Sequence, residues 1–437
     1  MAHMPLGYNL LWVTVGWIGL PVFLFSLIRP KRRATAAHRL TLRSDAPQPK
    51  GRRPIWIHAL SVGEVASAEP LVDGLRRALP GHPLVFSTAT LTGMQTARKL
   101  FADKVDGLFY SPYDVLFAVL RIVRRVDPAL VLLVETDIWP NFISALRRRH
   151  VPVLLVNARL SRQTYRGYRL LGRFARRVLS GFSHIGAQSQ RDARRFADLL
   201  GGVEQIEVTG NIKFDRTAPL DPEATGRALR LHWGIDPAQV VILLGSTHEG
   251  EETTGFALLE RLRAAGHAPL LIVAPRDPNR AEVVVRQARG RGLATMTVTR
   301  IDQTLSAGAA TVLVVAALGL LQPLYALADI AFVGGSLVAE GGHNPLEPAA
   351  CGTPILFGPD MSDFAAIAAQ LMAAGGAWRV ADGEQWYTAC HRLIAQPSVR
   401  KEMGHRALQV FQSNKGAVQR TLAMVQQALP PGEERKS

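Results

Sequence analysis

The sequence is poor in cysteine: Cys351 and Cys390 are the only two in 437 residues, with no C-x-x-C pair and no nearby histidine cluster. This scarcity argues against a disulfide-stapled fold and a structural zinc site, and it fits a reducing compartment. Low-complexity tracts and short-period repeats are also lacking, which argues against disordered and solenoid proteins. With 48% hydrophobic residues, the chain is long enough for two domains that each bury a core.

Charge of either sign is missing from residues 7–28, a run of 22 residues that contains five aromatic side chains. As a helix this run would extend about 33 Å at ~1.5 Å per residue, enough to cross a bilayer once. A cleaved signal peptide needs basic residues before the apolar run, whereas here they follow it. A buried core helix is the other alternative. We expect a transmembrane anchor at 7–28, a basic juxtamembrane segment at 29–53 and a cytoplasmic position for the rest.

Acidic residues are the scarcer charged type, with 35 Asp and Glu against 51 Lys and Arg and a net charge of +16. Such an excess indicates a polyanionic partner. Residues 142–191 hold eleven arginines and no acid. Five of these arginines recur at spacings of four, three, four and three, which on a helix makes one basic stripe: Arg162, Arg166, Arg169, Arg173 and Arg176.

The stripe has two interpretations. It is either a solvated helix surface or a binding face, and repulsion among five like charges favours an anionic counterpart. Nucleic acid is disfavoured, because the chain has no zinc-finger spacing, no RNP-type aromatic motif and no basic-leucine heptads. Next to a membrane anchor, anionic lipid headgroups or a phosphorylated lipid substrate explain the stripe better.

Short apolar runs alternate with helical patterns from about residue 54, which predicts an α/β protein with parallel sheets. The candidate strands are residues 55–60, 84–88, 130–134, 153–157, 185–188, 240–245, 270–274, 311–315, 330–333 and 354–357. Two prolines and several turn formers interrupt the pattern at 214–222. We therefore expect two Rossmann-like domains, 54–215 and 223–429, facing a cleft with ligands at the carboxyl ends of the strands.

A glycine-rich stretch in the second half is the densest candidate site. The strand 330–333 runs into Gly334, Gly335 and Ser336, and a second glycine pair at 341–342 precedes His343 and Asn344. Asn344 is a good N-cap for a following helix, whose N–H groups could hold a phosphate, while Glu347 could bind ribose hydroxyls. A glycine-rich turn without a ligand is the alternative.

The stretch 245–251 imitates a P-loop, but Glu251 stands where the lysine is required, so a P-loop kinase is disfavoured. Thr247 either caps the following helix or contacts a ligand.

Acidic residues follow two of the expected strands in the first half. Glu64 comes where the chain should turn into a helix, and it is either a general base or a first-turn acid on a helix dipole. Glu135 and Asp137 form an acid-x-acid triplet. They could bind a metal–diphosphate, recognise substrate hydroxyls or cap a helix, and metal binding is the least favoured because no third hard ligand is evident.

Together these motifs resemble the 3-deoxy-D-manno-octulosonic acid (Kdo) transferases of lipopolysaccharide synthesis. The matching pieces lie in order along the chain: H-A-L-S-V-G-E-V at 58–65, V-E-T-D-I-W-P-N at 134–141, N-A-R-L-S at 157–161, T-G-N-I-K-F-D at 209–215, L-G-S-T-H-E-G-E-E at 244–252, A-P-R at 274–276, F-V-G-G-S at 332–336 and G-G-H-N-P-L-E-P-A at 341–349. Such an ordered set is far more specific than any one motif.

The resemblance implies a GT-B fold in the bacterial inner membrane, with catalytic domains on the cytoplasmic side. It implies transfer from CMP-Kdo to the tetraacyl lipid A precursor (lipid IVA), with inversion and without a metal or cofactor. Glu64 would be the base. Acceptor contacts would come from Glu135, Asp137, Arg162, Arg166 and Arg169. Donor contacts would come from Lys213, Thr247, Arg276, Gly334, Gly335, Ser336, Gly342, His343, Asn344 and Glu347.

The chain departs from the family pattern twice, at residues 316–321 and at Asp277, where the family has two acids and a histidine respectively. Two other functions stay open. Another GT-B enzyme, such as a UDP-sugar transferase or epimerase, would share the fold. A non-catalytic, membrane-tethered binder of anionic lipids would explain the charge but not Glu64 or the late glycine stretch.

Overall fold

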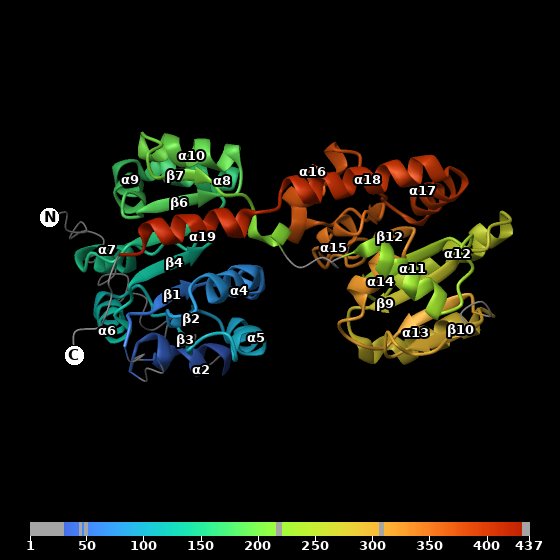
Figure 1. The fold of residues 1–437 in the computed structure, drawn as a ribbon, viewed down its shortest axis with the longest axis horizontal. Coiled ribbons are helices and arrows are strands. Elements are labelled where there is room, and N and C mark those ends of the chain that lie inside the picture. Colours follow the sequence, from blue (N-terminus) through green and yellow to red (C-terminus); the bar gives the residue numbers. More distant parts are fainter. Residues whose placement is uncertain (1–29, 43–45, 48–50, 216–220, 306–309, 431–437) are drawn as a thin grey trace. The chain divides into compact units, whose positions relative to one another are not determined.

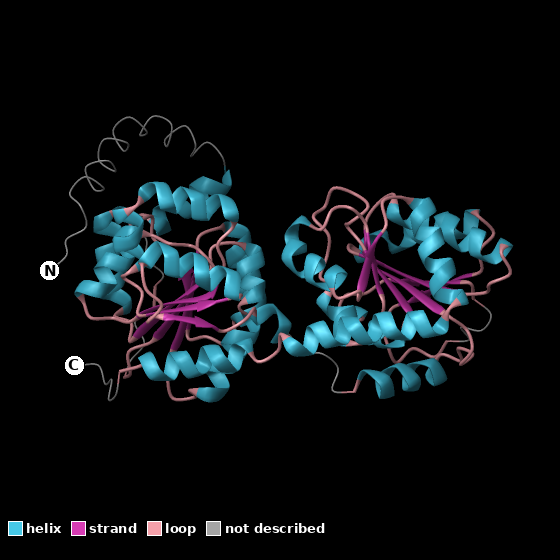
Figure 2. Ribbon diagram, turned by 90° about the horizontal axis from the view of Figure 1, so that it is seen from above, coloured by secondary structure: helices cyan, strands magenta, loops and turns pink. Residues whose placement is uncertain are grey.

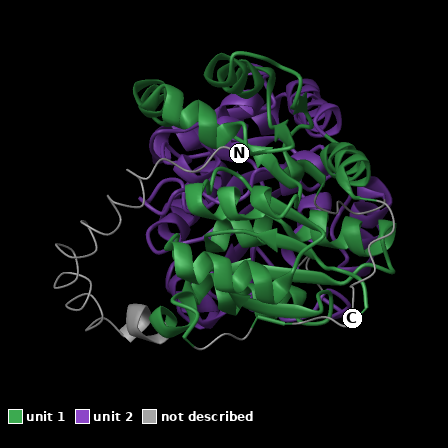
Figure 3. Ribbon diagram, turned by 90° about the vertical axis from the view of Figure 1, so that its left-hand side faces the viewer, with its two compact units in different colours: residues 1–216, 415–437 green, residues 217–414 purple. Residues whose placement is uncertain are grey.

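A computed structural model describes residues 30–42, 46–47, 51–215, 221–305 and 310–430. The described chain forms two compact units, which we call unit 1 (residues 1–216 and 415–437) and unit 2 (residues 217–414) (Figure 3). The predicted anchor at 7–28 lies outside the described residues. Among those that are described, no helix combines the length and the apolar character needed to span a bilayer.

Each unit is a parallel sheet with helices on its two faces (Figures 1 and 2). The sheet of unit 1 has the order β3-β2-β1-β4-β5-β6-β7. Its strands are β1 (Ile55–His58), β2 (Leu84–Thr88), β3 (Gly107–Tyr110), β4 (Leu130–Val134), β5 (Val153–Ala158), β6 (His184–Ala187) and β7 (Ile206–Val208). The inner strands β1, β2, β4 and β5 are buried along their whole length, which is why they are almost continuously apolar.

The helices of unit 1 are α2 (Pro30–Arg39), α3 (Val62–Ser67), α4 (Glu69–Ala78), α5 (Leu91–Phe101), α6 (Leu116–Val126), α7 (Pro140–Arg148), α8 (Arg162–Leu171), α9 (Arg173–Leu179), α10 (Gln190–Leu200), the 3-10 turn η1 (Ile212–Asp215) and α19 (Ala417–Ala428). Alternate strand residues point to opposite faces, so β1 places Trp56 in one core and Ile57 in the other. The helices close both cores.

Helix α19 returns from the end of the chain to unit 1. Its Val418, Met424 and Val425 pack into the core that contains Ile57, and Asp215 accepts hydrogen bonds from the N–H groups of Gly416 (2.7 Å) and Val418 (2.5 Å). The predicted second domain, 223–429, therefore runs too far, since unit 2 ends at 414. The apolar period of α19 identifies a helix but does not say which core receives it.

The sheet of unit 2 has the order β10-β11-β9-β8-β12-β13-β14. Its strands are β8 (Val241–Thr247), β9 (Leu270–Pro275), β10 (Thr295–Val298), β11 (Val312–Val315), β12 (Ile330–Val333), β13 (Ile355–Phe357) and β14 (Ala377–Arg379). Its helices are α11 (Pro222–His232), α12 (Glu251–Ala264), η2 (Pro278–Arg280), α13 (Ala281–Gly290), α14 (Leu321–Leu327), α15 (Leu346–Ala350), η4 (Ser362–Phe364), α16 (Ala365–Ala373), α17 (Gly383–Ala395) and α18 (Pro397–Ser413).

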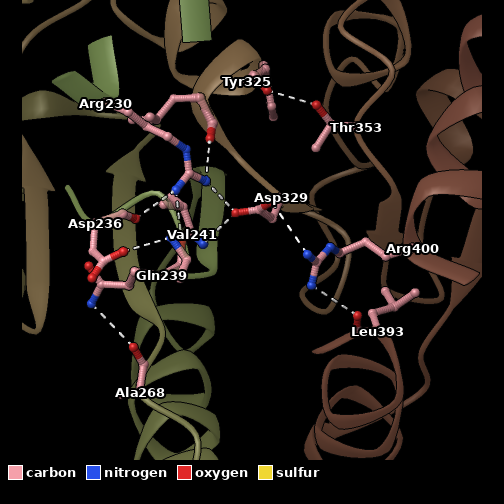
Figure 4. A network of polar contacts seen from close by, with 12 residues as sticks. Arg230, Asp236, Gln239, Val241, Ala268, Tyr325, Asp329, Thr353, Leu393 and Arg400 are labelled. Carbon is pink, nitrogen blue, oxygen red and sulfur yellow. Dashed lines mark hydrogen bonds and ion pairs between the residues drawn. The ribbon is translucent and has the colours of Figure 1, made fainter. Parts of the chain in front are cut away.

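An ion-pair network fastens the amino-terminal edge of this sheet (Figure 4). Asp329, just before β12, accepts the N–H of Val241 at 2.9 Å and pairs with Arg230 of α11 at 2.5 Å and Arg400 of α18 at 3.8 Å. Arg230 also donates to the carbonyls of Gln239 and Leu327. The network joins two helices to the start of the sheet.

In each sheet one pair of neighbouring strands is continued by the chain in opposite directions: β1 and β4 in unit 1, and β8 and β12 in unit 2. Open α/β sheets bind ligands at the carboxyl ends of the strands beside such a switch point. Four loops are thereby singled out: those after β1, β4, β8 and β12. They contain Glu64, the Glu135–Asp137 triplet, Thr247 and the Gly334–Gly335 pair.

Candidate functional site

Glu64 lies in the first turn of α3, directly beyond β1. It forms a capping box with Ser61, whose hydroxyl accepts the Glu64 N–H at 3.4 Å. In return, Oε2 of Glu64 accepts the N–H groups of Leu60 (2.6 Å) and Ser61 (3.4 Å). No described residue donates a hydrogen bond to Oε1. The first-turn role expected from the sequence is therefore present, and it leaves one oxygen available for chemistry.

The environment of Glu64 favours its protonated form. Burial raises the pKa of its carboxyl, Glu135 and Asp137 raise it further, and the N–H of Leu60 works in the opposite direction. A carboxylate with a raised pKa is a stronger base at neutral pH. The same loop thus holds the group in place and strengthens it.

Asp137 is buried, with 8% of its surface exposed. Its Oδ2 lies 2.7 Å from Nε2 of His58, the last residue of β1. His58 in turn contacts Ser87, with Nδ1 2.9 Å from the hydroxyl oxygen and 3.1 Å from the carbonyl oxygen. Of the two predicted acceptor-side acids, Asp137 is thus committed to a neighbour inside unit 1.

Glu135, directly after β4, and Asn157, the next-to-last residue of β5, have left-handed backbones, at φ +63° and +55°. Side chains rarely adopt this region, and such strain concentrates at functional sites. Oε1 of Glu135 lies 3.7 Å from Nζ of Lys213, and Oδ1 of Asn157 accepts the N–H of Ile212. Lys213, expected on the donor side, is therefore paired with a predicted acceptor residue within unit 1.

Two residues that the sequence analysis did not single out also reach this edge. Arg39 of α2 places its guanidinium 4.0 Å from the ring centre of Tyr113 and donates to the Ser111 carbonyl. Burial lowers the pKa of Arg39, while Tyr113 and Asp137 raise it; burial and then Asp137 raise the pKa of Tyr168 of α8. A cation and a phenol therefore lie near Asp137, brought by helices distant in sequence.

The predicted basic stripe is divided. Helix α8 ends at Leu171 and α9 begins at Arg173, because Gly172 turns the chain at φ +49°. Arg162, Arg166 and Arg169 are exposed on α8, which has no buried residue. Leu170 of the same helix is 90% exposed. One helix thus presents three arginines and an unburied leucine to solvent, while the other two arginines of the stripe belong to α9.

In unit 2, buried carboxylates support the loops after β8 and β12. Glu251, only 1% exposed, accepts the N–H groups of His248 (2.9 Å), Gly335 (2.8 Å), Ser336 (3.0 Å) and Leu337 (3.0 Å). The N–H groups of Gly335 and Ser336, which could have held a phosphate, are therefore occupied by a side chain.

Thr247 and Ser336 are also buried. The Thr247 hydroxyl donates to Glu252, which pairs with Arg280 at 2.7 Å. The Ser336 hydroxyl donates to the Val333 carbonyl and accepts the N–H of Gly358. Both side chains of the predicted donor set thus support the loops from beneath.

Glycine lets the two loops approach closely. A Cβ at Gly334 would lie 2.3 Å from the Ser246 carbonyl oxygen, and one at Gly342, where φ is +71°, would lie 2.5 Å from Sδ of Met361. The N–H of Gly342 donates to the Gly335 carbonyl, and that of His343 to the Gly334 carbonyl. The two glycine pairs of the sequence are thereby stacked into one turn.

His248 and His343 form a pair, with their Nε2 atoms 2.8 Å apart and their rings stacked. The pKa of His343 is lowered to about 4, first by burial and then by Arg276 and His248. Arg276 is exposed. Imidazole donors and a guanidinium therefore gather at the carboxyl edge of this sheet, where His248 was not predicted.

Asn344 and Glu347 lie at the start of α15. Oδ1 of Asn344 accepts the N–H of Leu346, and its amide donates to Oε1 of Glu347 at 3.2 Å. The helix has five residues and its N-cap is Pro345, one residue after the predicted Asn344. Where the structure describes the chain, no group of three His, Cys, Asp or Glu side chains could hold a metal ion.

Comparisons with known proteins agree along the chain. Residues 32–216 match the family model of 3-deoxy-D-manno-octulosonic-acid transferase (kdotransferase). The chain is 33% identical over 405 residues to the 3-deoxy-D-manno-octulosonic acid transferase of Haemophilus influenzae, covering 92% of this chain and 93% of that protein. It is 34% identical over 390 residues to the transferase of the same name from Bordetella pertussis, covering 86% and 87%.

Among solved structures, UDP-GlcNAc 2-epimerase from Neisseria meningitidis bound to UDP-GlcNAc is similar, with a TM-score of 0.57 at 13% identity over 86% of this chain and 100% of that one. At this identity the likeness concerns the fold. It supports a GT-B-like arrangement of two parallel-sheet α/β domains.

Proposed function

The chain belongs to the Kdo transferase family of glycosyltransferases, and from this membership we propose that it transfers Kdo from CMP-Kdo to lipid IVA, with Glu64 as the general base. The observation that carries the proposal is the position of Glu64. One carboxylate oxygen is anchored by two backbone N–H groups beyond β1, the other has no described partner, and the pKa is raised.

In the proposed reaction, Oε1 of Glu64 takes the proton of an acceptor hydroxyl as that oxygen attacks the anomeric carbon of Kdo. The bond from that carbon to the CMP phosphate oxygen breaks, and the anomeric centre inverts. The negative charge leaves with CMP. General-base catalysis of this kind typically contributes about 10²–10⁴-fold to a rate, and no metal enters the step.

We assign the acceptor to unit 1. Lipid IVA carries two phosphates, and the exposed arginines Arg162, Arg166 and Arg169 of α8 supply complementary charge. Exposed Leu170 beside them suits an acylated ligand in a membrane. The proposed anchor at 7–28 would hold the enzyme at the cytoplasmic face of the bacterial inner membrane, where anionic lipids are further partners.

We assign CMP to unit 2, at the turn formed by the two glycine pairs. His343 and exposed Arg276 can donate hydrogen bonds to the departing phosphate, while Glu347 can accept them from ribose hydroxyls. Gly334, Gly335 and Gly342 keep side chains away from the ligand. Thr247, Ser336 and Asn344 act by holding this turn in shape.

The test is mass spectrometry of lipid IVA after incubation with CMP-Kdo and the full-length protein in detergent. One or more added Kdo masses are expected, and their number counts the transfers. An unmodified lipid together with intact CMP binding would point to another acceptor. Unmodified lipid without CMP binding, but with UDP binding, would favour a UDP-sugar enzyme instead.

The base assignment is tested separately with Glu64→Gln. Turnover should fall by about 10²–10⁴-fold, because the amide cannot take the proton, while affinity for CMP-Kdo is retained. Glu249→Gln, a change of the same kind at an exposed site in unit 2, is the control. Near-normal turnover of Glu64→Gln would rule out this base.

A further inference from the structure

A chain of buried polar groups runs behind the Glu64 loop. Trp56 and His58 of β1 face Ser87 of β2, which is paired in register with His58. Nε1 of Trp56 lies 2.7 Å from the Ser87 hydroxyl, which lies 2.9 Å from Nδ1 of His58, and Nε2 of His58 lies 2.7 Å from Asp137. A polar group is costly to bury unless it has a hydrogen-bond partner. Each group of this chain has such a partner, although the chain is buried between two largely apolar strands.

The chemistry of the donors gives the chain a direction. Indole can only donate, so the Ser87 oxygen accepts from Trp56 and its own proton is free to go to Nδ1 of His58. Nε2 of His58 then carries the other proton and donates it to Asp137. In the other tautomer Nδ1 would donate to the Ser87 carbonyl, at 3.1 Å, and Nε2 of the neutral ring would then have no proton to donate to Asp137. The arrangement in which the Ser87 hydroxyl donates to Nδ1 is therefore the one that presents an ionised Asp137 with an N–H donor.

Asp137 follows β4, and the loop after the neighbouring strand β1 leads to Glu64. The charge of Asp137 acts on Glu64 of α3, on Arg39 of α2 and on Tyr168 of α8. Glu135, the larger of the two charges that raise the pKa of Glu64, is paired with Lys213. Helices α4 and α5, which pack against α3, carry Glu69, Asp73, Arg76, Arg77, Arg98 and Lys99. Of these, Glu69 and Asp73 pair with Lys104, and Arg76 pairs with Asp106.

We propose that His58 is a positioning residue for the transfer reaction: its hydrogen bond holds the Asp137 carboxylate, which follows the neighbouring strand β4, in place beside the loop that leads from β1 to Glu64. The proposal rests on the proposed function of Glu64. In the transfer step the acceptor proton goes to Glu64 and later to solvent. His58 and Asp137 neither gain nor lose a proton, which distinguishes this role from a relay.

The geometry agrees with a positioning role. Asp137 has 8% of its surface exposed and His58 only 2%, which leaves little room for substrate at either. The two residues come from neighbouring strand ends, β1 and β4, and their hydrogen bond ties the two loops at the switch point together. Burial, Glu135 and Asp137 all raise the pKa of Glu64, and the contribution of Asp137 agrees with its proposed role.

The experiment is the pH profile of kcat/KM for the full-length enzyme in detergent, with Asp137→Asn as the main variant. Asparagine keeps the shape and can accept from His58, but it removes the charge. We expect the acid limb, where Glu64 becomes protonated, to move to lower pH, and the plateau to fall by about tenfold because the base is weaker. An acid limb at its original pH would overturn the proposal.

Asp114→Asn is the matched control. Asp114 is also a buried aspartate of unit 1, and it accepts the N–H groups of Asn141 (3.0 Å) and Phe142 (2.9 Å) at the start of α7. It is not among the charges that act on Glu64. Its loss should lower thermal stability without moving the acid limb. A shift as large as that of Asp137→Asn would show that the limb reports general loosening of unit 1.

Two variants of His58 give an independent reading. Gln at position 58 can still donate to Asp137, whereas Leu cannot and leaves a buried carboxylate unpaired, which then takes up a proton. We expect His58→Gln to keep the acid limb and His58→Leu to move it as Asp137→Asn does. The same limb in both His58 variants would contradict the positioning role even if Asp137→Asn failed to fold.

The outcome for Glu64→Gln separates the two proposals. If it stays active, Glu64 is not the base, and the role of His58 and Asp137 beside it falls as well, while the transfer activity stands. If it is inactive and the limb does not move in Asp137→Asn, then Glu64 remains the base and only the role of His58 and Asp137 is overturned.

Discussion

A glutamate at the carboxyl-terminal edge of each sheet accepts backbone hydrogen bonds, but the two glutamates differ in how many of their oxygens are used. In unit 1, Glu64 uses one oxygen to hold its loop and leaves the other without a described partner. In unit 2, Glu251 accepts four backbone N–H groups, and both of its oxygens are used. A carboxylate with one oxygen that accepts no hydrogen bond can exchange a proton. A carboxylate whose two oxygens both accept backbone N–H groups stabilises the loops around it instead. The same residue type therefore serves chemistry in one unit and shape in the other.

The sharpest way to break this comparison is Glu251→Ala. Removing the shared acceptor leaves four N–H groups unpaired, three of them in the turn after β12, so we expect unit 2 to lose about 3–5 kcal/mol of unfolding free energy. CMP binding should be lost as well. Denaturant unfolding and CMP titration measure the two effects. Glu249→Ala, at the exposed neighbour, is the control and should be close to neutral; a mild effect of Glu251→Ala would mean that the loop is held by its glycines alone.

The comparison can be sharpened at the other end of the same sheet with Asp329→Ala. This change removes the acceptor shared by Arg230, Arg400 and Val241 (Figure 4). It should cost about 2 kcal/mol without altering CMP affinity, since it lies at the amino-terminal edge. Asp302→Ala, which breaks an exposed pair with Arg300, should leave the free energy of unfolding almost unchanged. Lost CMP affinity in Asp329→Ala would show that the two edges are coupled.

A third test concerns binding charge in unit 1. The double change Arg166→Glu and Arg169→Glu should raise the acceptor KM by about 30-fold, because each arginine near an anionic surface contributes about 1 kcal/mol. The donor KM should stay the same. Arg286→Glu, an exposed arginine of α13 in unit 2, controls for net charge. Equal acceptor KM values in the double variant and the parent would mean that α8 is a solvated surface helix and not a binding face.

The smallest expected effect is a difference between the two units in how their stability depends on pH. Burial lowers the pKa of His343 to about 4 from 6.5, so between these values the unfolded chain binds the proton more tightly and unit 2 loses stability as the pH falls. For Glu64 the pKa is raised, so acidification contributes stability to unit 1. His343→Gln should flatten the pH dependence of unfolding between pH 4 and 6.5. An unchanged slope would mean that His343 is not held neutral.

Hydrophobic pattern alone predicted the inner strands well. All ten strands expected from the sequence are present, and 84–88, 130–134 and 330–333 match β2, β4 and β12 residue for residue. The four missed strands are β3, β7, β10 and β14, which form the edges of the two sheets. Edge strands have a neighbour on one side only and keep exposed or half-buried residues, as β7 does. They therefore lack the apolar run by which the others were recognised.

Position at a strand end sufficed to single out Glu64, since a carboxylate beyond an apolar strand is visible in the sequence. The hydrogen bond between His58 and Asp137 was not predictable, because it joins residues 79 positions apart. Nor was it predictable that Glu251, which stands in the sequence where a P-loop would have its lysine, is the hydrogen-bond acceptor for the glycine turn. In both cases the missing information is which loops the sheet order brings together.

The return of α19 to unit 1 has a consequence for how the protein is made. Translation delivers residues in order, and domains generally fold as they emerge. Yet the core beneath β1 needs Val418, Met424 and Val425 from the far end of the chain. Most of unit 1 is therefore synthesised first, but unit 1 is completed last. Until α19 has been synthesised, the apolar side of α4 that packs against it stays exposed to solvent.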